Sequence, residues 1–373
     1  MNTDKIMFIG DPNPSHAIDT FFHGICEVFD EQNVYEFPPE MKYHSNYAND
    51  PYNFWTVKNA KKPTVGHMRG YQFYVDAFNN PDSGFKYIFC VNRPYLNSSY
   101  ATRRYPSLYT LVQLLNDIHP DRFKDIGVFF LEEEGDPTLY GHNEIYVKYF
   151  QNPTILEYDG TLKKYPSVFE KINIWLKVDF IRKYIKYPNK VFPLYISAPE
   201  DKLNEIVDNK ILSFEEKEYD VCFISGIHHD DRKKYYDILK NELKIGNNIL
   251  FCDRNSSFCG LKDYFNYLNK SKIVISVRGG EYSNTRNIEG PFLGCALFTQ
   301  KLDIEVPNDY IDGESAIFFD ETNLIEKLNY YISNQDKLKE LSIQSRNHCI
   351  KHHTTQARVL HYIEKIKQIK NWK

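Results

Sequence analysis

The sequence predicts an α/β protein with two doubly wound domains, each built on a parallel sheet. Short apolar runs, typical of strands buried on both faces, alternate with longer segments that have helical spacing. This alternation occurs in two series, one on each side of a polar, proline-containing stretch at residues 196–218. The length of 373 residues also suggests two domains, at about 150 residues per domain. Because parallel strands need crossover connections, each series is expected to form one open sheet.

The first series of strands and helices occupies the N-terminal half of the chain. It opens with the apolar run 6–9, which predicts a buried strand that ends at Gly10 and a turn-rich segment. Residues 38–64 are rich in Pro, Asn and Tyr and predict a long irregular loop. The other expected elements are a helix at 18–29, strands at 33–37 and 87–91, a helix at 107–118, a strand at 126–131 and a helix at 168–187. Together they predict an N-terminal domain at residues 1–195.

The second series follows the stretch 196–218, which is expected to be the interdomain linker. Its first strand, at 220–226, again ends in a glycine. The other expected elements are strands at 248–252, 272–277, 296–299 and 316–319, and helices at 323–333, 335–348 and 355–370. They predict a C-terminal domain at residues 219–353. The last segment, 354–373, carries apolar residues at helical spacing and is expected to pack back on the N-terminal domain.

The composition excludes several classes of protein. The formal net charge of −4 provides no basic field for nucleic acid, and no apolar run approaches the roughly 18 residues of a membrane-spanning helix. The N-terminus lacks the pattern of a signal peptide, and the seven cysteines are an odd, scattered set. We therefore expect free thiols and a cytoplasmic location. Aromatic residues in 38–64 and 92–106 could bind sugar rings or touch a membrane surface.

The segment 276–296 carries the residues best suited to a ligand. In open parallel sheets, ligands bind beyond the carboxyl ends of the strands, and this segment starts at such an end. Arg278 and Arg286 offer fork-shaped donors for phosphate groups. Gly279 and Gly280 allow the backbone to approach an oxygen-rich ligand closely. These residue types together predict a site for a diphosphate.

Two glutamates in the same segment suit the sugar parts of a ligand. Glu289, on the helix expected to follow, can accept hydrogen bonds from both hydroxyls of a ribose, as acidic residues do in dinucleotide sites. Glu281, on the preceding loop, can hold the hydroxyls of a hexose. Arginines for a diphosphate and acids for sugar hydroxyls are the groups that a nucleotide-sugar needs. The alternative is a solvated, salt-bridged loop between a strand and a helix.

Four stretches of the second series are similar to parts of a known family. They are YDVCFISG at 219–226 with the basic residues 232–234, the block 286–295, the strand and helix at 313–331, and HTTQAR at 353–358. These stretches resemble the donor-binding half of GT-B glycosyltransferases, most closely the group-1 type that includes CgeB-like proteins. The resemblance implies a GT-B fold, in which two Rossmann-like domains face each other across a cleft.

The resemblance also implies roles for individual residues. Glu289 would bind the donor ribose and Glu281 the transferred sugar, and Arg278 and Arg286 would share the catalytic role with Glu281. The residues implied to contact the donor besides Glu289 are Gly226, Arg232, Lys233, Gly279, Gly280 and Thr285. The spacing of the two glutamates fits retaining GT-B enzymes. The stretch 277–295 also resembles exostosin-type transferases, which invert the anomeric carbon, so both outcomes stay open.

Polar residues near the strand ends of the first series are candidates for the acceptor side. They are Gly10, Asp11 and His16 after the first strand, His67 in a Gly-His-Met-Arg-Gly stretch, and Glu132 in an acidic cluster. Any of them could lie near the acceptor and supply the base of an inverting reaction. The alternatives are a turn for the first group, a satisfied core histidine for the second and a solvated acidic turn for the third.

Motifs that the sequence lacks narrow the function further. There is no Asp-x-Asp, no Walker loop, no Gly-x-Gly-x-x-Gly after the first strand and no Gly-x-Ser-x-Gly elbow. We therefore expect a metal-independent glycosyltransferase without a cofactor, which moves a sugar from a nucleotide-sugar, with UDP the commonest carrier, to a glycan, lipid-linked or other hydroxyl acceptor. The alternatives are a non-catalytic carbohydrate- or nucleotide-binding protein and a UDP-sugar epimerase. Pro291 also predicts that the helix after the glutamates is short or kinked.

Overall fold

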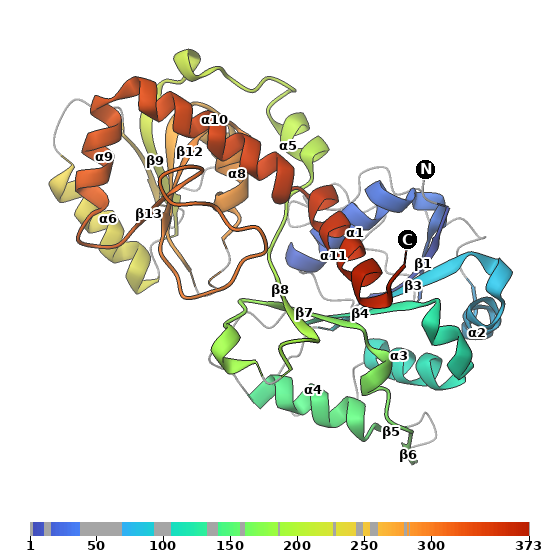
Figure 1. The fold of residues 1–373 in the computed structure, drawn as a ribbon. Coiled ribbons are helices and arrows are strands. Elements are labelled where there is room, and N and C mark those ends of the chain that lie inside the picture. Colours follow the sequence, from blue (N-terminus) through green and yellow to red (C-terminus); the bar gives the residue numbers. More distant parts are fainter. Residues whose placement is uncertain are drawn as a thin grey trace. The chain divides into compact units, whose positions relative to one another are not determined.

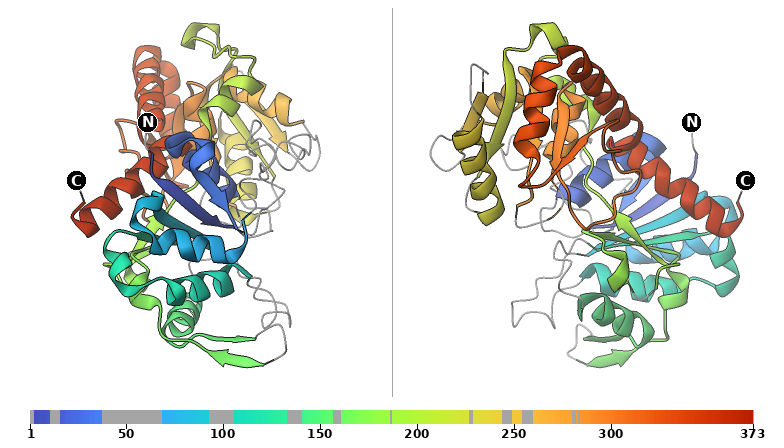
Figure 2. Two further views of the ribbon diagram at one scale, coloured as in Figure 1. Left: turned by 90° about the vertical axis from the view of Figure 1, so that its right-hand side faces the viewer. Right: turned by 60° about the vertical axis from the view of Figure 1, so that its left-hand side comes forward.

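The computed structural model divides the chain into two compact units, each with its own parallel sheet (Figures 1 and 2). The first unit comprises Met1–Tyr195 and Val359–Lys373, and the second comprises Ile196–Arg358. The structure describes residues 3–10, 16–37, 69–92, 106–132, 141–156, 161–185, 187–226, 229–243, 249–253, 260–279, 282 and 284–372. The expected loop at 38–64 lies outside these ranges.

The first unit contains a six-stranded parallel sheet in the order β2-β1-β3-β4-β7-β8. A separate antiparallel pair joins β5 and β6. The elements are β1 (Lys5–Ile9), α1 (His16–Phe29), β2 (Val34–Glu36), α2 (Tyr71–Asn79), β3 (Phe85–Asn92), α3 (Pro106–Asp117), β4 (Gly127–Glu132), α4 (Gly141–Gln151), β5 (Thr154–Leu156), β6 (Leu162–Lys164), β7 (Ile174–Val178), β8 (Val191–Leu194) and the part of α11 (Thr355–Lys370) from Val359 onward.

Helices cover both faces of the first sheet, as a doubly wound domain requires. On β1, Met7 and Ile9 belong to the core that α2, α3 and α4 cover. Phe8 points to the opposite face, because successive residues of a strand alternate, and packs on Phe22 of α1 with ring centroids 4.8 Å apart. This alternation explains why the run 6–9 is apolar at every position.

The C-terminal helix α11 packs on the same face of the first sheet as α1 (Figure 1). The ring of Tyr362 lies 6.0 Å from that of Phe21, and its hydroxyl donates to the carbonyl oxygen of Pro193 at 2.5 Å. Ile366 is fully buried beside Gly127, at the start of β4. The apolar face from Val359 to Ile366 is therefore part of the core of the first unit.

The helix expected at 168–187 does not form. Two short 3-10 turns, Phe169–Lys171 and Arg182–Tyr184, flank the strand β7, which pairs with β4 and β8. The apolar residues of this stretch fit a helical spacing, but β7 is buried at every position as an inner strand. Strand β8, which contains Pro193, was not expected; it is an edge strand, where a missing N–H is tolerated.

The second unit contains a five-stranded parallel sheet in the order β10-β9-β11-β12-β13. Its strands agree with the expected ones to within one or two residues. The elements are α5 (Glu200–Ile206), β9 (Tyr219–Ser225), α6 (Asp230–Glu242), β10 (Ile249–Asp253), α7 (Leu261–Asn269), β11 (Ser271–Ser276), α8 (Arg286–Phe292), β12 (Ala296–Gln300), β13 (Ile317–Phe319), α9 (Leu324–Ser333) and α10 (Gln335–His352). The stretch expected as a linker, 196–218, thus includes the helix α5.

The helix α8 is short and packs tightly on the sheet of the second unit. It ends at Phe292, one residue after Pro291, which confirms the expectation of a short helix. Gly290 faces β11 so closely that a Cβ atom there would lie 2.4 Å from Cγ1 of Val274. This contact holds α8 close against β11.

Two further expectations concern cysteines and membranes. Cys26, Cys90, Cys222, Cys295 and Cys349 are buried free thiols, as expected. Across the part of the chain that the structure describes, no helix combines the length and the apolar character needed to cross a bilayer.

Candidate functional site

The central candidate, Glu289, lies in the first turn of α8 and is only 3% exposed. Its Oε2 atom accepts a hydrogen bond from the hydroxyl of Tyr264 at 2.5 Å and another from Oγ1 of Thr285 at 3.0 Å. Burial and the adjacent carboxylate raise the pKa of Tyr264 well above its usual value, so this phenol stays a hydrogen-bond donor. The carboxylate of Glu289 is therefore held in one orientation by donors from α7 and from the residue that precedes α8.

Arg286 is also buried, at 7% exposure, and is bonded to the carboxyl end of β9. Its Nε atom donates to the carbonyl oxygen of Ile224 at 2.9 Å, and Nη2 donates to Oγ of Ser225 at 3.1 Å. Nη1 donates to Oδ1 of Asn284 at 3.2 Å. Three of its five N–H groups are used in this way, so Arg286 holds the start of α8 against β9 and brings its positive charge to that edge.

Arg278 follows β11 and is about one-third exposed, unlike Arg286. Its Nε atom forms a short ion pair with Oδ2 of Asp231, in the first turn of α6. Its guanidinium carbon lies 4.7 Å from the ring centre of Tyr282, and its backbone N–H donates to Oε1 of Gln300 at 3.2 Å. Arg278 is thus fixed by side chains from α6, from its own loop and from the end of β12.

The side chain of Arg232 contacts the backbone of the same loop. Its Nε atom donates to the carbonyl oxygen of Arg278 at 3.1 Å. Its guanidinium lies against Gly279, where a Cβ atom would come within 2.5 Å of Nη2. Glycine at 279 is therefore needed for the close approach of Arg232, rather than for the approach of a ligand alone.

The other donor-side residues divide into three groups. Gly226 is buried directly after β9, and Thr285 lies beside Glu289. Lys233 is exposed on α6. Gly280 and Glu281 lie outside the described residues. Seven of the expected donor-side and catalytic residues consequently lie on connections at the carboxyl edge of β9 and β11: Gly226, Arg232, Arg278, Gly279, Thr285, Arg286 and Glu289.

On the acceptor side, Glu132 is the residue whose surroundings are best defined. It ends β4 and is fully buried. Its carboxylate accepts a hydrogen bond from Nε1 of Trp175 at 2.8 Å and pairs with Nζ of Lys177 at 3.2 Å. These contacts favour a role in holding β4 to β7 over the solvated acidic turn considered from the sequence.

The remaining acceptor-side candidates are only partly described. Gly10 is buried at the end of β1, and His16 is the first residue of α1, with its side chain outside the described part. Asp11 and His67 lie outside the described residues. Their roles stay predictions.

Tyr264, Asn284, Asp231 and Gln300 are site residues that the sequence did not reveal. Asn284 links the segment internally, because its Nδ2 atom donates to the carbonyl oxygen of Val277 at 2.8 Å. Tyr264 precedes Glu289 by 25 positions, and Asp231 precedes Arg278 by 47. No short sequence motif reports contacts over such separations. The one available signal was the position of Asp231 and Gln300 next to strand ends.

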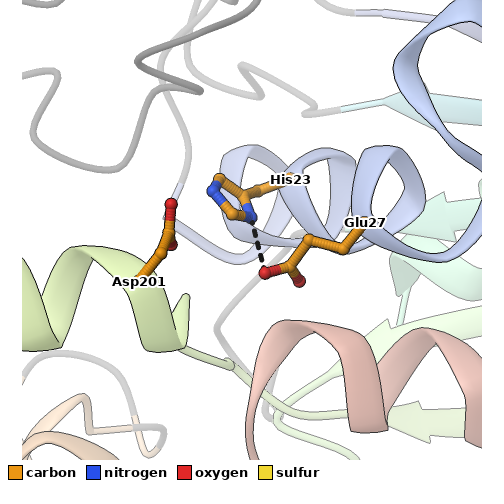
Figure 3. Close-up of side chains that lie close together, drawn as sticks. All are labelled: His23, Glu27 and Asp201. Carbon is orange, nitrogen blue, oxygen red and sulfur yellow. Dashed lines mark ion pairs between the residues drawn. The ribbon is translucent and has the colours of Figure 1, made fainter.

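The described residues offer little for binding a metal ion. Figure 3 shows His23 and Glu27 of α1, whose Nδ1 and Oε1 atoms are 3.5 Å apart; Asp201, drawn in the same figure, belongs to the second unit. Within either unit, the described ranges contain no group of three His, Cys, Asp or Glu residues whose ligand atoms lie close enough to share an ion.

Known proteins resemble this chain in its second unit and in its overall architecture. Residues 247–364 match the model of a family described as glycosyl transferase-like. No protein of curated function matches the sequence. Among solved structures, an alpha-glucosyltransferase in complex with UDP has a TM-score of 0.54 at 10% identity, with 98% of this chain and 99% of that chain covered.

Two further solved structures are similar over the full length. Anabaena HepE in complex with UDP has a TM-score of 0.51 at 9% identity and covers 98% of this chain and 100% of its own. A glycosyltransferase from Rickettsia africae has a TM-score of 0.50 at 12% identity and covers 99% of each chain. At such identities the shared feature is the fold, whereas the family match covers residues 247–358 of the second unit and 359–364 of the first. These findings agree with the resemblance expected from the sequence: the chain has the GT-B fold, and its residues 247–364 match a glycosyl transferase-like family model.

Proposed function

We propose that the chain transfers a sugar from a UDP-sugar to a hydroxyl group of a glycan or lipid-linked acceptor, without a metal ion. The observation that carries the proposal is the buried carboxylate of Glu289, oriented by Tyr264 and Thr285 at the carboxyl edge of the second sheet. Ligands of open parallel sheets bind at this edge. The second unit would therefore hold the donor and the first unit the acceptor.

Glu289 is suited to recognise the ribose of the donor. An ionised carboxylate accepts hydrogen bonds only, and the two ribose hydroxyls are donors that can share it. Tyr264 and Thr285 both bond Oε2, so the orientation of the group is set before the nucleotide arrives. A preoriented acceptor costs less conformational entropy on binding, which favours affinity.

Arg278 is suited to stabilise the diphosphate as it leaves. Its side chain is partly exposed, and charged hydrogen bonds to phosphate contribute about 1.5–3 kcal/mol each. Donors aimed where negative charge develops lower the barrier of the transfer step. Arg286 would add its charge from the start of α8 while most of its N–H groups keep the frame in place. This arrangement supplies the positive charge that a divalent cation supplies in other transferases.

The choice of UDP and of the acceptor rests on different arguments. The alpha-glucosyltransferase and HepE structures that share the fold both contain UDP. One alpha-glucosyltransferase structure also contains DNA, but the net charge of −4 of this chain favours a neutral glycan or lipid-linked hydroxyl over nucleic acid. The spacing of Glu281 and Glu289 favours retention of the anomeric configuration.

A thermal-shift screen of the full chain against nucleoside diphosphates and their sugars tests the donor site. We expect the largest rise in melting temperature with uridine diphosphate compounds, with or without a chelator. Transfer to a panel of glycan acceptors, followed by proton NMR of the product anomer, tests the reaction. Binding without turnover would favour the non-catalytic protein instead, and a changed sugar in the absence of acceptor would favour an epimerase. An inverted linkage would refute the retaining mechanism.

A further inference from the structure

The pair formed by Asp231 and Arg278 is the feature of the donor side that the transfer reaction does not itself explain. Arg278 needs its positive charge for a diphosphate, yet a carboxylate from another element already contacts it. The two side chains are about 30% exposed, so the pair is neither deeply buried nor fully solvated. Such a pair can act in two ways. It can compete with the ligand for the arginine, or it can hold the arginine in the orientation that the ligand requires.

The geometry of the pair favours the second role. Asp231 contacts Arg278 at Nε, the atom nearest the aliphatic stem, so the carboxylate engages the side edge of the guanidinium rather than the edge between its two terminal amino groups. The guanidinium carbon lies over the ring of Tyr282, 4.7 Å from its centre, and the side chain of Tyr282 also hydrogen-bonds to Arg278. A guanidinium fixed at Nε and against a ring still has N–H groups with which it can contact phosphate.

Asp231 is itself held in place. The side chain of Gln300, at the end of β12, hydrogen-bonds to the Asp231 carboxylate and accepts the backbone N–H of Arg278 at 3.2 Å. Desolvation acts against ionisation of Asp231, but the hydrogen bond and charge of Arg278 outweigh it and lower the pKa of the carboxyl below its usual value. The carboxylate therefore stays ionised near neutral pH and stays paired.

On these grounds we propose that Asp231 is the positioning residue for Arg278: with Gln300 and Tyr282, it orients the guanidinium toward the diphosphate of the donor. The inference rests on the proposed function, since Arg278 is taken there to bind the diphosphate. Arg is a long side chain with several rotatable bonds, and fixing it before binding removes an ordering cost that the ligand would otherwise meet.

The test compares UDP with uridine in the full-length chain by titration calorimetry, with uridine measured by displacement. Asp231→Ala is expected to weaken UDP binding by about threefold to tenfold and to leave uridine affinity within about twofold of wild type. Asp230→Ala is the matched control, because Asp230 lies in the same turn of α6, carries the same charge and is exposed. We expect no change in either affinity for this variant. In an Arg278→Met background, Asp231→Ala is expected to have no further effect on UDP, since non-additivity marks residues that act through each other.

Each other result has a definite meaning. Tighter UDP binding by Asp231→Ala would show that Asp231 competes with the ligand and would overturn the positioning role. An equal loss for UDP and uridine, or an undiminished effect in the Arg278→Met background, would assign Asp231 a general structural role and overturn it as well. A wild-type chain that binds no nucleoside diphosphate would refute the proposed function itself. Normal UDP binding by Asp231→Ala, beside weakened binding by Arg278→Met, would refute only the role of Asp231.

Discussion

The contact between Gly290 and Val274 makes a sharp test of how α8 is placed. In Gly290→Ala, the new Cβ would lie 2.4 Å from Cγ1, 2.9 Å from Cβ and 3.1 Å from Cγ2 of Val274. Carbon atoms pack best at about 3.5–4.0 Å, so α8 must move by roughly 1 Å or β11 must give way. Val274 cannot turn aside easily, because its branched side chain has few rotamers and it is fully buried in an inner strand.

The magnitude follows from two opposing effects. Overpacking of a core costs about 1–3 kcal/mol, and three contacts below 3.2 Å place this site at the upper end. Alanine in place of glycine inside a helix stabilises the folded state by about 1 kcal/mol. The free energy of unfolding of the second unit should therefore fall by about 2 kcal/mol, which corresponds to a loss of about 4–8 °C in Tm for a domain of this size.

The assay is thermal unfolding of the full chain, with a second glycine as control. Gly260→Ala should shift Tm far less, because the nearest atom to its Cβ position is Oδ2 of Asp263 at 3.7 Å. Gly290→Ala combined with Val274→Ala should be less destabilised than the sum of the two single variants, since the smaller side chain makes room for the new methyl group. If Gly290→Ala unfolds at the same temperature as Gly260→Ala, the close contact that holds α8 against β11 is refuted.

Three further predictions concern the donor site and the pH dependence of stability. Glu289→Ala should weaken UDP binding by about 1–3 kcal/mol in calorimetry, because the ribose hydrogen bonds are lost. Glu289→Gln keeps one acceptor oxygen and should therefore lose less binding free energy. Unchanged UDP affinity in both variants would contradict the ribose contact. Gly279→Ala should displace the guanidinium of Arg232, because Nη2 would lie 2.5 Å from the new Cβ. The variant should weaken UDP binding. Its effect on Tm should be smaller than that of Gly290→Ala, because the end of an arginine side chain can move. Burial and the neighbouring Arg358 lower the pKa of His353 well below its usual value. The unfolded chain then binds a proton near pH 6.5 that the folded chain does not, so stability should fall as the pH drops from 7 to 5; His353→Asn should show a shallower fall in denaturant titrations, and an identical pH slope would argue against a buried neutral histidine.

The contacts of α11 and of β7 show where sequence reasoning succeeds and where it fails. The packing of α11 on the first unit was expected from its apolar face, because a helix of this kind must cover a hydrophobic surface somewhere. The strand β7 was mistaken for a helix, since Ile174, Trp175, Leu176 and Val178 fit both patterns when a strand is buried on both faces. This stretch forms a strand because it pairs with β4 and β8, and that pairing depends on residues more than ten positions away.

Within the donor site, too, the sequence predicted some residues and missed others. Glu289, Arg278 and Gly279 were found from residue type and from their place after a strand, because the carboxyl ends of parallel strands meet at one edge whatever the details of packing. Their partners were not found. Tyr264, Asp231 and Gln300 come from other elements, and apart from the position of Asp231 and Gln300 next to strand ends, nothing in the local sequence indicates that they contact these residues.

The sequence by itself determined the alternation of strands and helices, the two parallel sheets and the edge at which polar residues would gather. These follow from local periodicity and from the handedness of the crossover connections, which act over short stretches of chain. Only the tertiary structure decided that Glu289 is oriented by Tyr264, that Arg286 is bonded to the end of β9, and that Arg278 is paired with Asp231. Hydrogen bonds and ion pairs depend on distances of a few tenths of an ångström between segments far apart in the chain, and those distances exist only once the sheet and its helices have packed.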